Sequence, residues 1–66
     1  MPLVNIHVFE GRLTPETETQ LIEGITDVIV GVFGEQVRDA TWVILQETSA
    51  ARWGIGGRPG ASPIPR

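Results

Sequence analysis

The chain has 66 residues with no cysteine and one histidine, so we expect neither a disulfide framework nor a dedicated metal site. Its formal net charge is −3 and its five basic residues are all arginines, which argues against the clustered basic face of a nucleic-acid-binding protein. No apolar run approaches the roughly 20 residues of a membrane span and no signal peptide is visible, so we expect one cytoplasmic domain over residues 1–66 that binds no membrane.

Pro2 follows the initiator Met1, which is usually removed when the second residue is small. Removal leaves a free secondary amine, and such an amine can exchange protons near neutral pH when burial or a nearby cation lowers its pKa. With Met1 attached, the same nitrogen is a tertiary amide and cannot act as a base. The dipeptide also fits a proline that simply occupies the first position of a strand, where it costs no ladder hydrogen bond.

The segment Leu3 to Phe9 has the alternation of a β-strand. His7 falls on the face opposite the apolar one, and we expect a structural or intersubunit role for it. The apolar face consists of alternate residues, Val4, Ile6 and Val8. Residues 10–13 form a connection in which Gly11 supplies backbone freedom.

A helix is predicted from Pro15 to Phe33. Thr14 is suited to the N-cap and Pro15 to the first helical position, while Gly34 is suited to the end. Gly24 and Gly31 lie seven residues apart, hence on one helix face, and each costs about 1 kcal/mol relative to alanine. Either this cost is tolerated, or a neighbouring backbone approaches the helix closely at this face.

A second strand is predicted from Ala40 to Glu47, and its apolar character is nearly continuous. Two strands joined by a long helical crossover form a parallel βαβ unit, so the fold class is α/β. Continuous apolar character indicates burial on both faces, yet a single helix covers only one face of a two-stranded sheet. A chain this small is also marginal alone. Both arguments predict self-association.

The glycine-rich segment Arg52 to Gly60 does not follow a strand and open a helix, so a phosphate-binding loop is not expected there. A tight hairpin or an arm over a neighbouring subunit fits better. Residues 58–66 are expected to form an extended tail.

Several features together resemble the 4-oxalocrotonate tautomerase family over about residues 2–57. They are Pro2 at the start of a strand, Glu10-Gly11-Arg12, a capped helix, an apolar second strand and Trp53-Gly54-Ile55-Gly56-Gly57. The resemblance implies a βαβ subunit, two of which pair into a four-stranded sheet with helices on one side. Three such dimers would form a homohexamer. It also implies enol–keto tautomerisation of small unsaturated 2-hydroxy and 2-oxo acids without a metal or organic cofactor.

The resemblance also implies roles for individual residues. Pro2 matches the amino-terminal proline that acts as base and then acid, Arg12 the arginine that holds a substrate carboxylate, and Trp53 an aromatic pocket wall. These groups come from different subunits in the family. A second arginine of the family is replaced here by Trp42, and Arg38 or Arg52 could substitute for it. This replacement disfavours dicarboxylate substrates and favours a monoacid or an aromatic enol.

Two further readings stay open. A hydratase or dehalogenase acting on haloacrylate-like acids would need a carboxylate that activates water, and Glu10 and Glu47 are the candidates. Alternatively, the chain is a non-catalytic oligomeric module whose proline is incidental.

Overall fold

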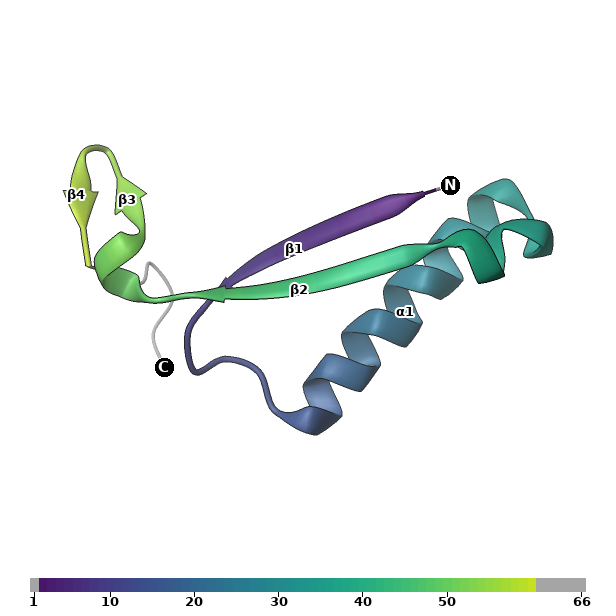
Figure 1. Cartoon of the computed structure of the whole chain (residues 1–66), viewed down its shortest axis with the longest axis horizontal. Coiled ribbons are helices and arrows are strands. Elements are labelled where there is room, and N and C mark those ends of the chain that lie inside the picture. Colours follow the sequence, from purple (N-terminus) through teal and green to yellow (C-terminus); the bar gives the residue numbers. More distant parts are fainter. Residues whose placement is uncertain (1, 61–66) are drawn as a thin grey trace.

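The computed structural model describes residues 2–60, which follow a β–α–β path (Figure 1). Strand β1 (Leu3–Phe9) leads into helix α1 (Pro15–Phe33), and the chain returns in strand β2 (Trp42–Thr48). The two strands are parallel, with Leu3 opposite Trp42 and Phe9 opposite Thr48. The predicted parallel βαβ unit and the predicted bounds of the helix are both confirmed.

Helix α1 is fixed at both ends by its own local sequence. The Thr17 amide donates to the Thr14 hydroxyl at 3.2 Å, and the Thr14 amide donates to the Thr17 hydroxyl at 2.8 Å, so the two threonines cap each other. At the other end, Gly34 leaves the helix with φ 104° and donates its amide to Val30. The Gln36 side chain then donates to the Phe33 carbonyl at 2.8 Å, which satisfies one of the last helical acceptors.

A short 3₁₀ helix, η1 (Glu35–Ala40), precedes β2 and moves the start of the strand. The sequence-based expectation placed the strand at 40–47, but Ala40 is the last residue of η1. Thr41 closes that turn, because its amide donates to Arg38 at 3.2 Å and its hydroxyl donates to Val37 at 2.7 Å. The strand therefore begins at Trp42 and continues to Thr48.

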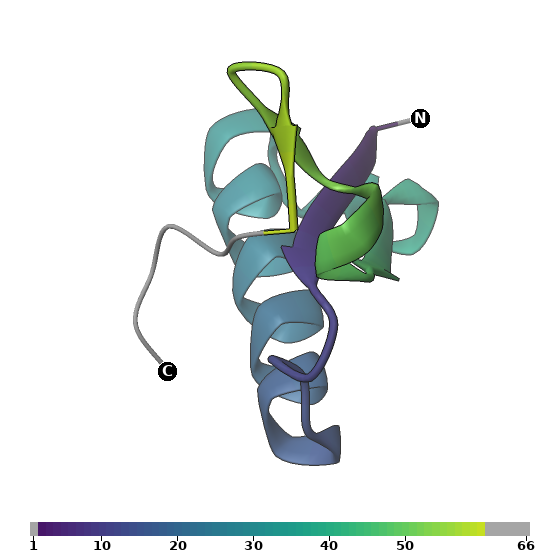
Figure 2. The same ribbon diagram turned by 90° about the vertical axis from the view of Figure 1, so that its left-hand side faces the viewer.

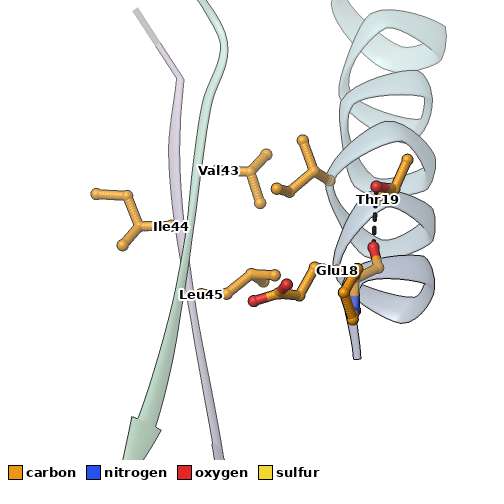
Figure 3. A pocket seen from close by; sticks show the side chains of 7 residues that line it. Glu18, Thr19, Val43, Ile44 and Leu45 are labelled. Atoms are coloured by element: carbon orange, nitrogen blue, oxygen red, sulfur yellow. Dashed lines mark hydrogen bonds between the residues drawn. The ribbon is translucent and has the colours of Figure 1, made fainter. Parts of the chain in front are cut away.

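Helix α1 covers one face of the two strands, and Figure 2 shows it along one side of them. Val43 and Leu45 point toward the helix, whereas Ile44 points away from it (Figure 3). Among residues 2–60, Phe9 is the one buried residue, with 7% of its surface exposed. Large apolar side chains are exposed on both layers and on the segment that follows β2: Leu3, Ile22, Val28, Val32, Phe33, Trp42, Ile44 and Ile55. The subunit alone has almost no core.

The glycine-rich segment forms a hairpin beyond the ends of β1 and β2 (Figure 1). A short 3₁₀ helix, η2 (Ala50–Arg52), precedes the antiparallel strands β3 (Gly54–Ile55) and β4 (Arg58–Pro59). Gly56 and Gly57 turn the chain with φ 61° and 81°, a region that favours glycine. The hairpin takes in the first two residues of the expected tail 58–66, whereas 61–66 and Met1 lie outside the described residues. Nowhere in residues 2–60 is a helix long and apolar enough to cross a bilayer.

Candidate active site

Pro2 lies immediately before β1, half-buried, and is tied to the start of β2. Its carbonyl accepts the Trp42 amide hydrogen at 2.9 Å, which extends the parallel ladder by one bond. Trp42 pairs with Leu3 in the register and is 56% exposed. Because alternate residues of a strand share a face, Trp42 lies on the same face as Ile44, away from α1. Pro2 and Trp42, two of the sequence-predicted site residues, are thus neighbours.

Trp53 lies at the other end of β1. Its ring stacks on Phe9, the last residue of β1, with 4.1 Å between the ring centroids and 27° between the planes. The Trp53 amide donates to Ala50, and the Trp53 carbonyl accepts the Gly60 amide, so the hairpin fixes the backbone of Trp53 from both sides. The aromatic stack accounts for the burial of Phe9.

Arg12 follows β1 at this same end, in a turn that Glu47 holds. The Gly11 amide donates to a carboxylate oxygen of Glu47 at 2.9 Å, and Gly11 itself has φ 89°. The Glu10 amide donates to the Thr48 carbonyl at 3.0 Å and extends the pairing of the two strands. The half-buried Arg12 is therefore anchored just past the sheet, on the side of Trp53 rather than of Pro2.

The candidate residues fall into two groups that a single chain does not bring together. Pro2 and Trp42 lie at the start of the parallel strands, and Arg12 and Trp53 lie past their ends. Seven strand residues separate the two groups, which at about 3.3 Å per residue corresponds to about 23 Å. A small acid cannot contact Pro2 and Arg12 of the same chain at once.

Two shallow hollows flank the Trp53 end. One, of about 340 Å³, is lined by His7, Thr48, Arg52, Trp53 and Gly54. The other, of about 390 Å³, is lined by Glu10, Glu47, Thr48, Ser49 and Arg52. Arg52 borders both, because η2 places it directly before Trp53. The position of His7 beside Trp53 could not be read from the sequence, since it depends on where the hairpin folds.

A third hollow, of about 590 Å³, lies between α1 and β2 and contains none of the sequence-predicted site residues (Figure 3). The hydroxyl of Thr19 donates to the Pro15 carbonyl at 3.0 Å, so it is used within the helix. The charged group that lines this hollow is the carboxylate of Glu18, and the side chains of Ile22, Val43 and Leu45 are apolar. Such a lining offers no cation for an acidic substrate.

Arg38 is committed to an ion-pair cluster that ties η1 to α1. Its guanidinium donates to Glu35 at 2.5 Å and to Asp27 at 3.0 Å. The hydrogen bond to Glu35, followed by the one to Asp27, raises the pKa of Arg38 above its usual range. The arrangement supports a structural role for Arg38.

Known proteins resemble the chain along most of its length. The family model described as "Tautomerase enzyme" matches residues 2–61. "Probable tautomerase K2" of Dickeya dadantii is 40% identical over 57 residues, which span 86% of this chain and 84% of that protein. "Probable tautomerase RSp0893" of Ralstonia nicotianae is 41% identical over 59 residues, spanning 89% and 81% of the two proteins.

Solved structures agree with these matches. TomN, described as a 4-oxalocrotonate tautomerase homologue in the tomaymycin biosynthetic pathway, has a TM-score of 0.78 and 34% identity, covering 88% of this chain and 86% of its own. DmpI from Helicobacter pylori has a TM-score of 0.78 and 33% identity, covering 88% of both chains. The apo unfused 4-OT has a TM-score of 0.79 and 27% identity, covering 91% of this chain and 100% of its own.

Proposed function

The chain belongs to the tautomerase family and is an isomerase, and from this premise we propose that it interconverts enol and keto forms of small unsaturated 2-hydroxy and 2-oxo acids. Pro2, freed by removal of Met1, is the base and the acid of this reaction. Its amine takes the proton of the enol hydroxyl and returns a proton to a carbon of the conjugated system. No net proton is gained or lost, so no cofactor is required.

The placement of Pro2 supports this role. Its carbonyl holds the sheet through Trp42 at 2.9 Å, so the residue is fixed without the use of its nitrogen. The described pairing with β2 uses the carbonyl of Pro2, so it does not depend on the nitrogen that removal of Met1 turns into an amine. This is the observation that carries the proposal, together with a family match that includes Pro2.

Arg12 and Trp53 complete the proposed site from neighbouring subunits of a homohexamer. The guanidinium of Arg12 binds the substrate carboxylate through its planar fork of donors, and the Trp53–Phe9 stack forms an apolar wall. In one chain, a strand of seven residues, about 23 Å long at about 3.3 Å per residue, separates Pro2 from Arg12, so in this proposal one site draws on more than one chain. The exposed apolar surface on both layers of the subunit supports the assembly.

The position of Glu47 gives no support to the hydratase alternative. Its carboxylate accepts the Gly11 amide hydrogen at 2.9 Å and so stabilises the turn that carries Arg12. Family membership likewise favours an enzyme over a non-catalytic module.

The role of Pro2 is tested with native protein whose intact mass shows whether Met1 is absent. Ketonisation of phenylenolpyruvate and of 2-hydroxymuconate is then compared between this protein and Pro2→Ala. We expect Pro2→Ala to lower kcat by about 10²- to 10⁴-fold, the usual contribution of general acid–base catalysis.

A second variant separates the amine from the ring. Insertion of one alanine between Met1 and Pro2 keeps the proline but converts its nitrogen to an amide once Met1 is removed. This variant should be as inactive as Pro2→Ala while its circular dichroism stays unchanged. Full activity in the insertion variant would refute the role of the Pro2 amine, whereas full activity in Pro2→Ala, which keeps a primary amine at this position, would refute the need for the proline ring.

A further inference from the structure

Charged and apolar groups are segregated along the strands. At the start of the sheet, the large apolar side chains on the face away from α1 are exposed, Leu3 by 50%, Trp42 by 56% and Ile44 by 39%, and the polar Asn5 lies among them opposite Ile44. Past the other end of the sheet lie three arginines, Arg12, Arg52 and Arg58, together with the carboxylates of Glu10 and Glu47. The two ends of the subunit therefore present different chemistry to a bound acid.

An arginine lies near the apolar end, but its guanidinium is paired with two carboxylates of the same chain. Arg38 belongs to η1, which leads directly into Trp42, and its guanidinium contacts Asp27 at 3.0 Å and Glu35 at 2.5 Å. A guanidinium paired with two carboxylates has little attraction left for a third. Among the described residues, Trp42 is hydrogen-bonded to Pro2 and Leu3 follows it in the chain, so an indole and an aliphatic side chain are placed at this end of the strands.

Trp42 is hydrogen-bonded to the proline and presents an exposed ring. Its amide donates to the Pro2 carbonyl, so its backbone cannot move independently of Pro2. Its ring is not covered by the helix or by the hairpin of its own chain, since 56% of the residue remains exposed. An indole offers a flat apolar surface and one donor, which suits an aromatic or apolar group far better than a carboxylate.

We infer that the site prefers an enol acid with a single carboxylate, whose flat apolar remainder lies against Trp42. This inference rests on the proposed function, since it places Pro2 at the reacting centre. The carboxylate lies toward the arginine-bearing end of a neighbouring subunit. A second carboxylate on the substrate would have to leave water and face the indole without a cation, which is costly.

The preference is measured as the ratio of kcat/KM for phenylenolpyruvate, which has one carboxylate and an aryl group, to kcat/KM for 2-hydroxymuconate, which has two carboxylates. We expect the wild-type ratio to exceed about tenfold, the scale of discrimination by an apolar pocket. Trp42→Arg should lower the ratio below one, because a guanidinium binds the second carboxylate. Trp42→Phe should keep the wild-type preference.

The matched control is Ile44→Arg, which adds the same charge on the same face of β2, two residues farther from Pro2. It should leave the ratio near the wild-type value. A wild-type ratio below one, or equal shifts in Trp42→Arg and Ile44→Arg, would overturn the inference. Circular dichroism checks folding, and if Trp42→Arg does not fold, Trp42→Gln must lower the rate on phenylenolpyruvate without a gain on 2-hydroxymuconate.

A binding measurement decides the inference even if Pro2 is not the catalytic group. The chain has two tryptophans, so Trp53→Phe leaves Trp42 as the only reporter. Its fluorescence should change saturably with 3-phenylpropanoate and much less with hexanedioate, neither of which can tautomerise. No response to 3-phenylpropanoate, or a stronger response to hexanedioate, would refute the preference. Activity that is indifferent to Pro2→Ala would instead refute the proposed function.

Discussion

The role proposed for Pro2 is compatible with its place in the sheet, because pairing and proton transfer would use different atoms. Its carbonyl accepts the Trp42 amide hydrogen, while its nitrogen lies at the edge of the chain where no ladder bond is due. The Pro2–Trp42 hydrogen bond therefore does not depend on the chemical state of the Pro2 nitrogen.

Arg12 is where the proposed carboxylate contact can be tested most directly. We expect Arg12→Gln to lower kcat/KM by about 10- to 100-fold, since hydrogen bonds to charged groups contribute about 1.5 to 3 kcal/mol. Arg12→Lys should recover only part of this loss, because an ammonium lacks the planar pair of donors. Steady-state kinetics on phenylenolpyruvate measure both variants.

The matched control for Arg12 is Arg58→Gln, in strand β4 of the hairpin. It removes an arginine from the same end of the subunit, but the proposed site does not use it. Equal losses in Arg12→Gln and Arg58→Gln would indicate a general charge effect and contradict the assigned role.

Each secondary-structure element places its functional residues by local rules. β1 acts as a spacer of seven residues with Pro2 before it and Arg12 after it, so its length fixes how far apart the two groups lie. Helix α1 begins at a threonine cap and ends at a glycine, which returns the chain to the start of β2 beside Pro2. A change in helix length would shift β2 against β1 and separate Trp42 from Pro2.

Gly34 is the point at which this return is most sensitive. Its φ of 104° and ψ of 161° belong to a region that is essentially restricted to glycine. A Cβ there would also meet the Gln36 side chain, which is flexible enough to move away. Gly34→Ala should therefore lower the free energy of unfolding by about 1 to 3 kcal/mol through backbone strain. Urea denaturation at fixed protein concentration measures this change.

Gly24→Ala is the matched comparison, and it also tests the role of the helix glycines. A Cβ on Gly24 meets nothing within 4 Å in its own chain, so alanine should stabilise the helix by up to about 1 kcal/mol. A destabilised Gly24→Ala protein would instead indicate a neighbouring backbone against this helix face. Unchanged stability in Gly34→Ala would contradict the strain argument.

The elements could be predicted where short-range chemistry determines them, and not elsewhere. Thr14, Pro15 and Gly34 mark the helix ends in the sequence, and the structure has them there. The strand after the helix starts later than predicted, because η1 is stabilised by pairing of Arg38 with Asp27 on α1, a contact between distant residues. The candidate site residues lie at the two ends of β1, and their separation follows from the length of that strand. The sequence predicted that they come from different subunits only through the family resemblance.

At the scale of the whole molecule, the sheet and the helix do not enclose a hydrophobic core between them. Phe9 is the one buried residue among those described, and apolar side chains such as Val32, at 71% exposed, and Trp42, at 56%, face outward. A folded monomer with this surface would be unstable and prone to associate. Association with other subunits would bury this surface. It would also bring together the residues of the proposed site, so stability and the proposed activity both depend on it.

Subunit mixing tests this dependence directly. Pro2→Ala and Arg12→Gln chains are each expected to retain at most about a tenth of wild-type activity, following the losses argued above. If a site takes its proline from one chain and its arginine from another, equal mixing gives both intact groups in about a quarter of the sites of a closed oligomer. The two variants, unfolded together and refolded by dilution, should then recover about a quarter of the activity of wild-type protein treated in the same way. Each variant refolded alone supplies the baseline. A mixture no more active than that baseline would show that Pro2 and Arg12 do not act across a subunit boundary, despite the strand that separates them within one chain.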